Sequence, residues 1–392
     1  MRVAIVTERT SISLGGAERS VSELAYALSL LGHEVSILAA VGKAEAANVH
    51  VVCPQTTSKR VDFRMFSRCL QEHLTGNDYD IVHSVLPFDF ADVYQPRGGT
   101  YAESIERNAA SYENVLLRWW KRATAFANFR RTRLLRAERT LCQAQNGPAI
   151  AALSQYVAMQ IEKHYKTPGR RVSVIPNGVR TDRSVDAKRA QRVRSQILSQ
   201  LRIREQDAPV LFLFAANNFR LKGLAPLVQA MSVAAAHQPE CNAVLVVAGR
   251  GRAAKYRRLA RRCGMIEKIA FLGPVDNIQN LHSVIDVGIL PTFYDPSSRF
   301  TLEVLAHGKP VVTTRYNGAR DLFKNERHGI VIGEPTDISA LANAIAFFSR
   351  RENIVRASEA IEQDDLNRSI SIVRAARDLD QLYKSLADGD NA

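Results

Sequence analysis

The sequence predicts an α/β protein built of two parallel-sheet, Rossmann-like domains, and three observations support this fold class. Short apolar runs alternate with longer amphipathic stretches along most of the chain, as in repeated strand–helix–strand units. Residues 2–38 already have the pattern of one such unit. The length of 392 residues is sufficient for two domains of ordinary size.

The first predicted unit begins with a strand over 2–7. Gly15 and Gly16 follow it, and a helix with apolar residues at steps of three and four then leads to a strand over 34–38. Two glycines at this turn let a backbone approach a ligand closely, although a tight turn without a functional role explains them equally well. The spacing lacks the dinucleotide fingerprint, so NAD binding has little support.

Further strands of the first domain are predicted at 80–84 and 149–154, the latter as its last core strand. His83 lies in the first of these strands, and a lone histidine is more often structural than catalytic. A loop with proline and two glycines follows near 94–103 and contains Arg97, a candidate phosphate ligand. These positions give the first domain candidate polar residues but no defined reaction.

Residues 105–141 combine many arginines with both tryptophans of the chain, and no Pro or Gly interrupts them. We therefore predict helix, and two interpretations are open. An amphipathic helix rich in Trp, Phe and Arg suits an anionic lipid surface, whereas a pair of packed helices with a solvated basic face fits equally. Nucleic acid has little support, because no recognised motif accompanies the charge. The candidate membrane residues are Trp119, Trp120, Arg130, Arg131 and Arg133.

Composition indicates a soluble globular protein with an anionic partner. The chain is 46% hydrophobic and 23% charged, with a net charge of +14. No apolar run reaches the roughly 18 residues of a transmembrane helix, and the N-terminus does not read as a signal peptide. Five scattered cysteines without metal or redox spacing favour a reducing cytoplasm.

The second domain is predicted from strands at 210–214, 243–247, 269–273 and 329–332. The loop after the first of these contains Asn217, Arg220 and Lys222, and Gly249 follows the second. Residues 338–387 are predicted to be helical. A lysine in such a loop is usually only solvated, so its role depends on what lies beside it.

A strand, loop, helix and strand are predicted over 284–314. The helix runs from Arg299 to His307, with Gly308 as its stop. Open backbone amides over 298–301 would attract phosphate at the helix N-terminus. Asp295 and Glu303 lie close to this anion site and can accept hydrogen bonds from sugar hydroxyls. A capped surface helix with ordinary acidic residues remains an equal alternative.

These residues resemble a known family. Asp295 and Glu303, eight positions apart and followed by Gly-Lys-Pro-Val-Val, resemble the donor-site signature of retaining glycosyltransferases of family 4. The run Ile-Pro-Asn-Gly-Val at 175–179 resembles the family's entry to its second domain. The resemblance implies the GT-B fold, in which two Rossmann-like domains face each other across a cleft and the C-terminal helix returns to the first domain. The implied limits are 1–170, 171–364 and 365–392.

The resemblance also implies roles for the candidates. Asp295 would contact the donor sugar and Glu303 the ribose, while Lys222 and Arg220 would neutralise the diphosphate. This chain departs from the family at Asp295, where Glu is usual, at Asn217, where Arg is common, and at Gly98, where related enzymes have an Asp. The remaining implied donor-site residues are Gly15, Gly16, Asn217, Gly249, Ser298, Arg299, Phe300 and Thr301, and the acceptor-side candidates are His83, Asp89 and Arg97.

The implied activity is metal-independent transfer of a hexosyl group with retained configuration. The substrate is a nucleotide-diphosphate sugar, with a UDP-sugar as first choice, and no cofactor or metal ion is expected. The branch most resembled acts on lipopolysaccharide core, which implies a glycolipid acceptor and a peripheral position on the inner face of the cytoplasmic membrane. Two alternatives are a lipid-binding protein that has lost transferase activity and a sugar-phosphate epimerase of the same fold.

Overall fold

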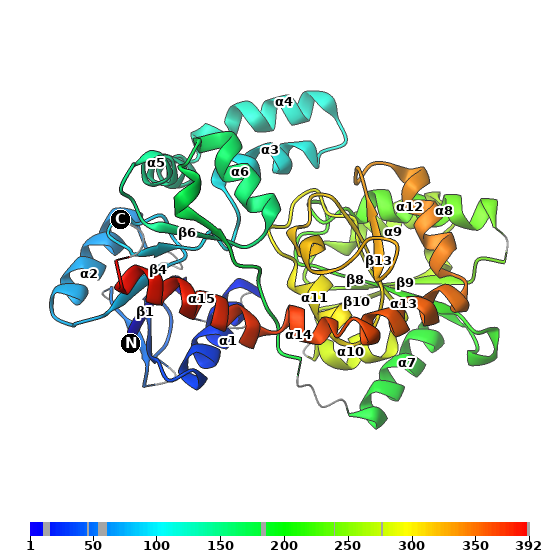
Figure 1. Ribbon diagram of the computed structural model, residues 1–392. Helices are drawn as coiled ribbons and strands as arrows, with labels where there is room; N and C mark the ends of the chain where they lie inside the picture. Colours follow the sequence, from blue (N-terminus) through cyan, green and yellow to red (C-terminus); the bar gives the residue numbers. More distant parts are fainter. Residues whose placement is uncertain are drawn as a thin grey trace. The chain divides into compact units, whose positions relative to one another are not determined.

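The computed structural model describes residues 1–10, 16–44, 47–53, 61–181, 186–238, 240–275 and 277–389. The chain forms two compact units, drawn in Figure 1. The first comprises Met1–Ala109, Glu113–Val179 and Ser371–Ala392, and the second Ala110–Tyr112 and Arg180–Ile370. The chain thus passes between units at 179–180 and 370–371, somewhat beyond the predicted limits of 170 and 364.

The first unit contains a parallel sheet of seven strands in the order β3-β2-β1-β4-β5-β6-β7. The predicted last core strand at 149–154 is the buried β6, and the partly buried β7 pairs with it at the sheet edge, with Ile150 opposite Val172. The strands are β1 (Arg2–Arg9), β2 (Glu34–Val41), β3 (Val49–Val51), β4 (Ile81–Ser84), β5 (Val93–Tyr94), β6 (Ala149–Ala152) and β7 (Val172–Val174).

Alternating strand residues point to two faces of this sheet, as the pleat requires. Ile5 and Ile37 face a core that includes Leu28 of α1 and Leu379 of α15, whereas Val6 faces one built with α2. The helices are α1 (Gly16–Leu30), α2 (Phe63–Thr75), α3 (Tyr101–Ala110), α4 (Val115–Ala123), α5 (Phe129–Gln143), α6 (Gln155–Tyr165) and α15 (Ile372–Ala387), with η2 (Thr124–Ala127) and η3 (Gly169–Arg171) as short 3-10 turns.

The second unit contains a parallel sheet of six strands in the order β10-β9-β8-β11-β12-β13. Its core includes Phe212 on β8, Ile289 on β11 and Leu227 on α8, all inaccessible to solvent. Each strand lies where the sequence predicted one. The strands are β8 (Val210–Ala215), β9 (Ala243–Ala248), β10 (Ile269–Gly273), β11 (Val287–Leu290), β12 (Val311–Thr314) and β13 (Gly329–Ile332).

Helices on both faces of this sheet complete the second unit, and α8 and α12 pack against each other. The helix that was predicted over 299–307 is confirmed as α11. The helices are α7 (Ala187–Leu201), α8 (Leu224–His237), α9 (Ala253–Arg262), α10 (Ile278–Val284), α11 (Arg299–Ala306), α12 (Ile338–Phe348), α13 (Arg351–Gln363) and α14 (Leu366–Ile370), with 3-10 turns η4 (Glu205–Asp207), η5 (Ile266–Lys268) and η6 (Gly318–Leu322).

The predicted return of the C-terminal helix is confirmed, since α15 packs on α1 in the first unit. Its first residue, Ile372, donates a backbone hydrogen bond to Val179 at 2.8 Å. Arg374 donates to the carbonyl oxygens of Pro176 and Asn177 at 2.8 and 3.0 Å. These bonds fasten the predicted Ile-Pro-Asn-Gly-Val linker to the start of α15.

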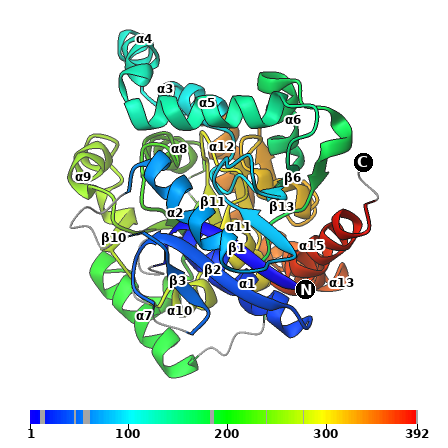
Figure 2. The ribbon, with the colours of Figure 1, turned by 90° about the vertical axis from the view of Figure 1, so that its left-hand side faces the viewer.

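The basic segment 105–141 is helical, as predicted, but is divided among α3, α4 and α5. Asn114 and Asn128 cap α4 and α5, and the amide side chain of each accepts from a backbone N–H in the first turn. Figures 1 and 2 show α4 outermost in this part of the first unit, beyond α3. Within the described ranges, no helix has the length and hydropathy to cross a membrane.

Candidate functional site

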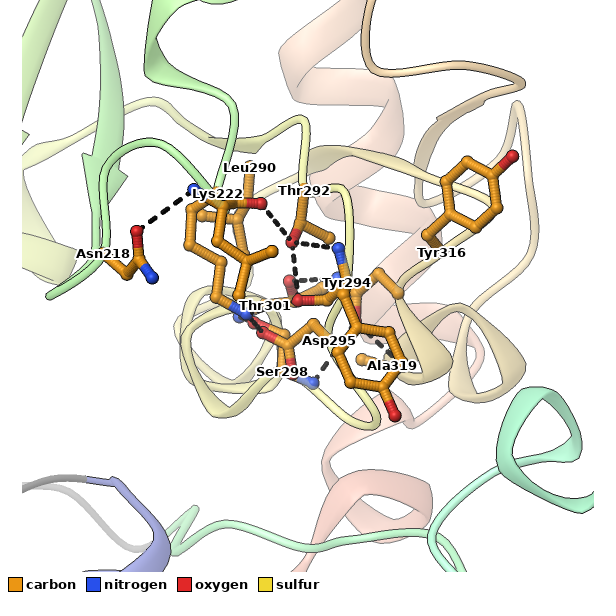
Figure 3. Close-up of polar contacts among 12 residues, drawn as sticks. Asn218, Lys222, Leu290, Thr292, Tyr294, Asp295, Ser298, Thr301, Tyr316 and Ala319 are labelled. Carbon is orange, nitrogen blue, oxygen red and sulfur yellow. Dashed lines mark hydrogen bonds and ion pairs between the residues drawn. The ribbon is translucent and has the colours of Figure 1, made fainter. Parts of the chain in front are cut away.

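The sequence-predicted residues gather most densely at the carboxyl ends of β8, β11 and β12 in the second unit. Ligands of parallel α/β sheets bind at this edge. The loop after β8 carries Lys222 and the loop after β11 carries Asp295, which precedes α11. Figure 3 shows Lys222 reaching across to Asp295, with Ser298 and Thr301 of the α11 N-terminus beside the pair.

Lys222 and Asp295 form a close ion pair. The Lys222 Nζ lies 2.6 Å from Oδ2 of Asp295 and donates a second hydrogen bond to the Tyr294 carbonyl oxygen at 2.8 Å. The two side chains are 20% and 15% exposed, so the pair is shielded but remains within reach of a ligand. An ammonium group has three donors, so the geometry leaves Lys222 the capacity for one further acceptor.

The N-terminus of α11 is closed more tightly than predicted. The Ser298 side chain caps the helix by accepting from the Thr301 amide at 3.3 Å, and the Ser298 amide donates to Asn317 Oδ1 at 3.2 Å. The prediction that all amides over 298–301 are open is therefore wrong, because the cap and a neighbouring loop use two of them. No described residue accepts a hydrogen bond from the Phe300 amide, which can bind an anion.

Glu303 lies one turn into α11 and pairs with Arg299. Its Oε1 accepts from the Arg299 guanidinium at 3.1 Å, and both side chains are at most 10% exposed. The sequence predicted both residues near the site but not their pairing. A carboxylate has about four acceptor positions, so Glu303 can keep Arg299 and bind hydroxyl groups as well.

Two glycines allow the loops at this edge to pack closely. Gly223 and Gly249 have φ values of +83° and +122°, and a Cβ on either would overlap a backbone carbonyl, that of Pro291 or Ala216. Gly249 was predicted to line the donor site. The structure gives a packing reason for a glycine there, because its loop lies against the residue that follows β8.

Asn217 and Arg220 have different surroundings from Lys222. Asn217 Oδ1 accepts from the Arg250 amide at 3.3 Å, so this side chain braces the loop after β9 and supplies no charge. The Arg220 guanidinium lies 3.8 Å from the ring centroid of Tyr112 and donates to Ser111, both from the short segment grouped with the second unit. Neither Asn217 nor Arg220 therefore contacts Asp295 in the way that Lys222 does.

A buried polar network beneath the site escaped the sequence analysis. Thr292, Thr313, Thr314 and Asn317 are all inaccessible to solvent. Thr314 Oγ1 donates to the Thr292 carbonyl at 2.6 Å, and Thr292 Oγ1 lies 3.3 Å from the Leu221 carbonyl, next to Lys222. The available signal was a buried strand ending in Thr-Thr and followed by Asn-Gly, a pattern that also describes an ordinary turn.

The first-unit candidates do not form one cluster. Gly15 lies outside the described residues, and Gly16 is the exposed first residue of α1. His83 is fully buried, and its Nδ1 lies 2.5 Å from the Tyr383 hydroxyl on α15. Burial and the charge of Arg97 lower the pKa of His83 to about 3. His83 is therefore a neutral core residue, and its predicted place at an acceptor surface is not supported.

Asp89 and Arg97 occupy separate loops of the first unit. Asp89 is exposed after β4. Arg97 is half-buried after β5 and donates to Ser20 of α1 and, at 3.4 Å, to Asn177 of the linker. Arg97 thus connects three parts of the first unit, and Asp89 is the candidate that faces solvent.

The helix α4 has no buried residue, although apolar side chains form much of it. Leu116, Trp119 and Trp120 are 79%, 74% and 57% exposed. Soluble proteins rarely leave such side chains together on the surface without a partner. The exposure of Trp119 and Trp120 is consistent with a docking surface.

The arginines predicted for the same surface behave differently. Arg130 pairs with Glu8 at 2.8 Å and Arg133 pairs with Asp62. Arg131 is only partly exposed. These contacts attach α5 to the rest of the first unit, which corrects the expectation that Arg130 and Arg133 are free to meet an external anion.

One group among the described residues has metal-ligand chemistry, namely Glu103, Glu106 and His164 in the first unit. The Lys163 ammonium already lies 3.0 and 3.3 Å from the two glutamates. Burial would raise the pKa of Glu103, but hydrogen bonds from His164 and Lys163 outweigh it and lower the pKa to about 2. The negative charge of Glu103 and Glu106 is therefore offset by the Lys163 ammonium group.

Two family models match the chain, one on each unit. Residues 14–183 match the model "Glycosyltransferase Family 4", and residues 208–350 match "Glycosyl transferases group 1". The chain is 24% identical to the lipopolysaccharide glucosyltransferase WaaG of Escherichia coli K12 over 82% of both proteins.

Solved structures of similar fold support the architecture. A crystal structure of WaaG covers 99% of this chain and 98% of its own, with a TM-score of 0.68 and 20% identity. The Anabaena protein HepE, in complex with UDP-glucose, covers 98% of this chain and 100% of its own, with a TM-score of 0.70 and 15% identity. At these identities the likeness establishes the fold, which both share with this chain.

Proposed function

Because the chain carries the two domains of a family 4 glycosyltransferase with the GT-B fold, we propose that it transfers a hexosyl group from a nucleotide-diphosphate sugar, with retained configuration, to a membrane-associated glycolipid such as lipopolysaccharide core. The observation that carries this proposal is the Lys222–Asp295 pair, held beside the N-terminus of the helix that bears Glu303. A cation, an anion-binding helix end and two carboxylates match the diphosphate and the two sugars of such a donor.

The diphosphate is bound by Lys222 and by the N-terminus of α11. The third N–H of Lys222 and the Phe300 amide supply direct donors, and the helix dipole adds a partial positive charge. Negative charge grows on the leaving phosphate as the glycosidic bond breaks. Donors fixed before the reaction stabilise this charge most effectively, and the contacts of Lys222 with Asp295 and Tyr294 fix its position.

The two carboxylates bind the two sugars. Asp295 accepts hydrogen bonds from hydroxyls of the transferred sugar, while its contact with Lys222 couples that sugar to the diphosphate. Glu303 accepts from the ribose hydroxyls while it remains paired with Arg299. Each charge-assisted hydrogen bond of this kind is worth roughly 1.5–3 kcal/mol.

The reaction proceeds with retention and without a metal ion in this proposal. The acceptor attacks the face from which the diphosphate departs, and the departing phosphate oxygen accepts the acceptor's proton, so no protein nucleophile is required. Lys222, with Arg220 nearby in sequence, supplies the positive charge that a metal ion would otherwise provide. Addition of a chelator should leave turnover unchanged, and loss of turnover would contradict this part of the proposal.

The acceptor is a glycolipid at the inner face of the cytoplasmic membrane. The similarity to WaaG, described as a lipopolysaccharide glucosyltransferase, supports this acceptor class. The exposed apolar side chains of α4 provide a surface that enters the headgroup region, and the net charge of +14 favours anionic lipid. UDP-glucose is the first donor to test, because the similarly folded HepE contains it.

Release of nucleoside diphosphate from a panel of nucleotide sugars tests the proposal. The wild-type protein should hydrolyse one of them slowly without an acceptor and faster with a lipopolysaccharide core fragment. Proton NMR of the first released sugar should show the anomer of the donor. Vesicle binding without binding or turnover of any nucleotide sugar would instead support a lipid-binding protein that has lost transferase activity.

A further inference from the structure

We propose that Asn317 is the positioning residue of the donor site, fixing the N-terminus of α11 against the Asp295 loop with an uncharged side chain. This inference rests on the proposed function, because it assigns the diphosphate to the α11 N-terminus. Asn317 is fully buried and caps η6, three residues after the end of β12. Its role follows from contacts that lie within the second unit.

The Asn317 amide uses its whole hydrogen-bonding capacity. Its Nδ2 donates to Thr301 Oγ1 on α11 and to Thr313 Oγ1 on β12, both at 2.9 Å. Its Oδ1 accepts from the amides of Ser298 and Ala319 at 3.2 and 3.1 Å. Two donors and two acceptor positions are what an asparagine side chain offers, and among the other residues only the longer glutamine has the same groups.

The backbone around Asn317 holds the Asp295 loop in the same way. The Asp295 amide donates to the Tyr316 carbonyl, and the Gly318 amide donates to the Asp295 carbonyl, both at 2.9 Å. The side chain therefore fixes α11 while the adjoining backbone fixes Asp295. Because Asp295 holds Lys222, the three groups proposed to bind the donor share one support.

The absence of charge on the Asn317 side chain matters for diphosphate binding as much as its hydrogen-bond geometry does. A carboxylate at this position would retain the two acceptor contacts and would receive a third hydrogen bond from the Thr301 hydroxyl, whereas the Thr313 hydroxyl already donates to the Leu290 carbonyl at 2.9 Å. The carboxylate would also place a negative charge at the positive end of α11, where an anion is stabilised. Such a charge competes directly with the diphosphate, whereas the amide leaves the helix end available to it.

The variant Asn317→Asp separates positioning of the ligand from support of the fold. The two side chains have nearly equal volume, and three donors surround the new carboxylate, so we expect the protein to fold. The Kd for UDP should rise on the order of 10- to 100-fold at about pH 8. The ratio of variant to wild-type Kd should fall towards one for uridine, which has the base and ribose of UDP but no phosphate for the new carboxylate to repel.

The comparison of UDP with uridine separates the diphosphate from the rest of the nucleotide. The charged groups on the elements packed against Asn317 are the same in both proteins, namely Lys222, Asp295, Arg299, Glu303, Arg315, Arg320 and Asp321. A ratio that is raised for UDP and not for uridine therefore reports the introduced carboxylate.

Two further variants complete the experiment. Asn353→Asp makes the same change at another buried asparagine of the second unit, on α13, where Nδ2 donates to the Phe347 carbonyl at 2.8 Å. It should leave the Kd for UDP unchanged even if it lowers the Tm. Thr301→Val removes one acceptor of Asn317 and should raise the Kd about three- to tenfold.

The outcomes separate this inference from the proposed function. If wild-type protein binds UDP and Asn317→Asp binds it equally, the inference is wrong. A ratio that is raised equally for UDP and for uridine also contradicts the proposed electrostatic role. If Asn317→Asp does not fold, an unchanged Kd in Thr301→Val contradicts the inference. Absence of UDP, GDP and ADP binding to the wild-type protein would overturn the proposed function itself.

Discussion

At the α11 edge of the second unit, the polar side chains that support the site are buried, whereas on α4 of the first unit the apolar side chains face solvent. Asn317 and Thr313 are inaccessible and hydrogen-bonded, while Trp119 is 74% exposed and α4 has no buried residue. Each region reverses the usual distribution of polar and apolar groups.

The difference shows two exceptions to the rule that apolar side chains are buried and polar ones exposed, and we assign each a functional reason. Buried polar groups are costly unless every one has a partner, so the α11 edge is fixed before a ligand arrives. The large apolar side chains of α4 remain mostly exposed within the unit, so α4 gains from a partner outside it. We therefore expect substitutions at the first region to affect chemistry, and those at the second to affect location.

The largest effect is expected for Lys222→Ala. The ammonium is needed most when charge develops on the leaving phosphate, so turnover of the nucleotide sugar should fall on the order of 100-fold or more. Arg220→Ala should cost less, because its guanidinium lies over Tyr112 and not against Asp295. Steady-state release of nucleoside diphosphate measures both.

The matched control is Lys188→Ala, which removes an exposed lysine from α7 in the same unit. Its turnover should equal that of the wild type. An equal loss in the Lys222 and Arg220 variants, or a larger loss for Arg220, would mean that the diphosphate contacts have been assigned to the wrong cation.

Replacement of Trp119 and Trp120 by Ser should alter location without altering chemistry. The two side chains offer a large apolar area to a lipid interface, so binding to vesicles of phosphatidylcholine with phosphatidylglycerol should weaken on the order of tenfold or more. Hydrolysis of the nucleotide sugar should be nearly unchanged. Vesicle sedimentation and donor turnover provide the two measurements.

Leu30→Ser is the control for this pair, since Leu30 is 64% exposed on α1, a different helix of the first unit. Wild-type binding should also fall with salt, because the screening length shrinks from about 10 Å at 0.1 M to about 3 Å at 1 M. If the wild-type protein does not bind anionic vesicles at low salt, α4 is an ordinary exposed helix and not a membrane-docking surface.

The sequence predicted the repeated elements because their signals are local. The apolar period of α1, the apolar runs of β8 and β9, and the turn before α11 can each be recognised within a few residues. Family motifs in the sequence also singled out the charged candidates Lys222, Asp295 and Glu303, whose roles stay predictions. All three occupy the carboxyl edge of the second sheet or the helix that follows it.

The missed features depend on residues that are distant in the chain. His83 bonds to Tyr383, and Arg130 pairs with Glu8; neither contact has a local sequence signal. Asn317 resembles any asparagine before a glycine, and its four contacts appear only when α11, β12 and η6 have packed together. Residues 105–141 are divided into three helices because Asn114 and Asn128 cap new helix starts. The prediction relied on the absence of Pro and Gly, so it did not foresee these breaks.

A smaller effect is expected from Glu138, a buried carboxyl group on α5. Glu138 accepts from the hydroxyls of Tyr94 and Tyr165 and from the Tyr101 amide. Burial raises its pKa from 4.5 to about 7, and these hydrogen bonds oppose the shift only in part. The folded protein therefore holds a proton that the unfolded chain has lost between these pH values.

The stability of the protein should consequently decrease as pH rises from about 4.5 to about 7, by at most about 3 kcal/mol from this group. Glu138→Gln does not titrate, so the Tm difference between variant and wild type should shift in favour of the variant over this range. Thermal unfolding at several pH values measures it. A Tm difference that is constant with pH would contradict the raised pKa.

The central claim, that the α11 edge binds the nucleotide, is tested most directly by calorimetric titration with UDP. Wild-type protein should bind UDP, and Glu303→Gln should bind it about 10- to 100-fold more weakly, because a charge-assisted contact to the ribose is lost. Glu359→Gln, which changes an exposed glutamate on α13, should bind as the wild type does. Equal affinity of Glu303→Gln and wild-type protein for UDP would contradict the account.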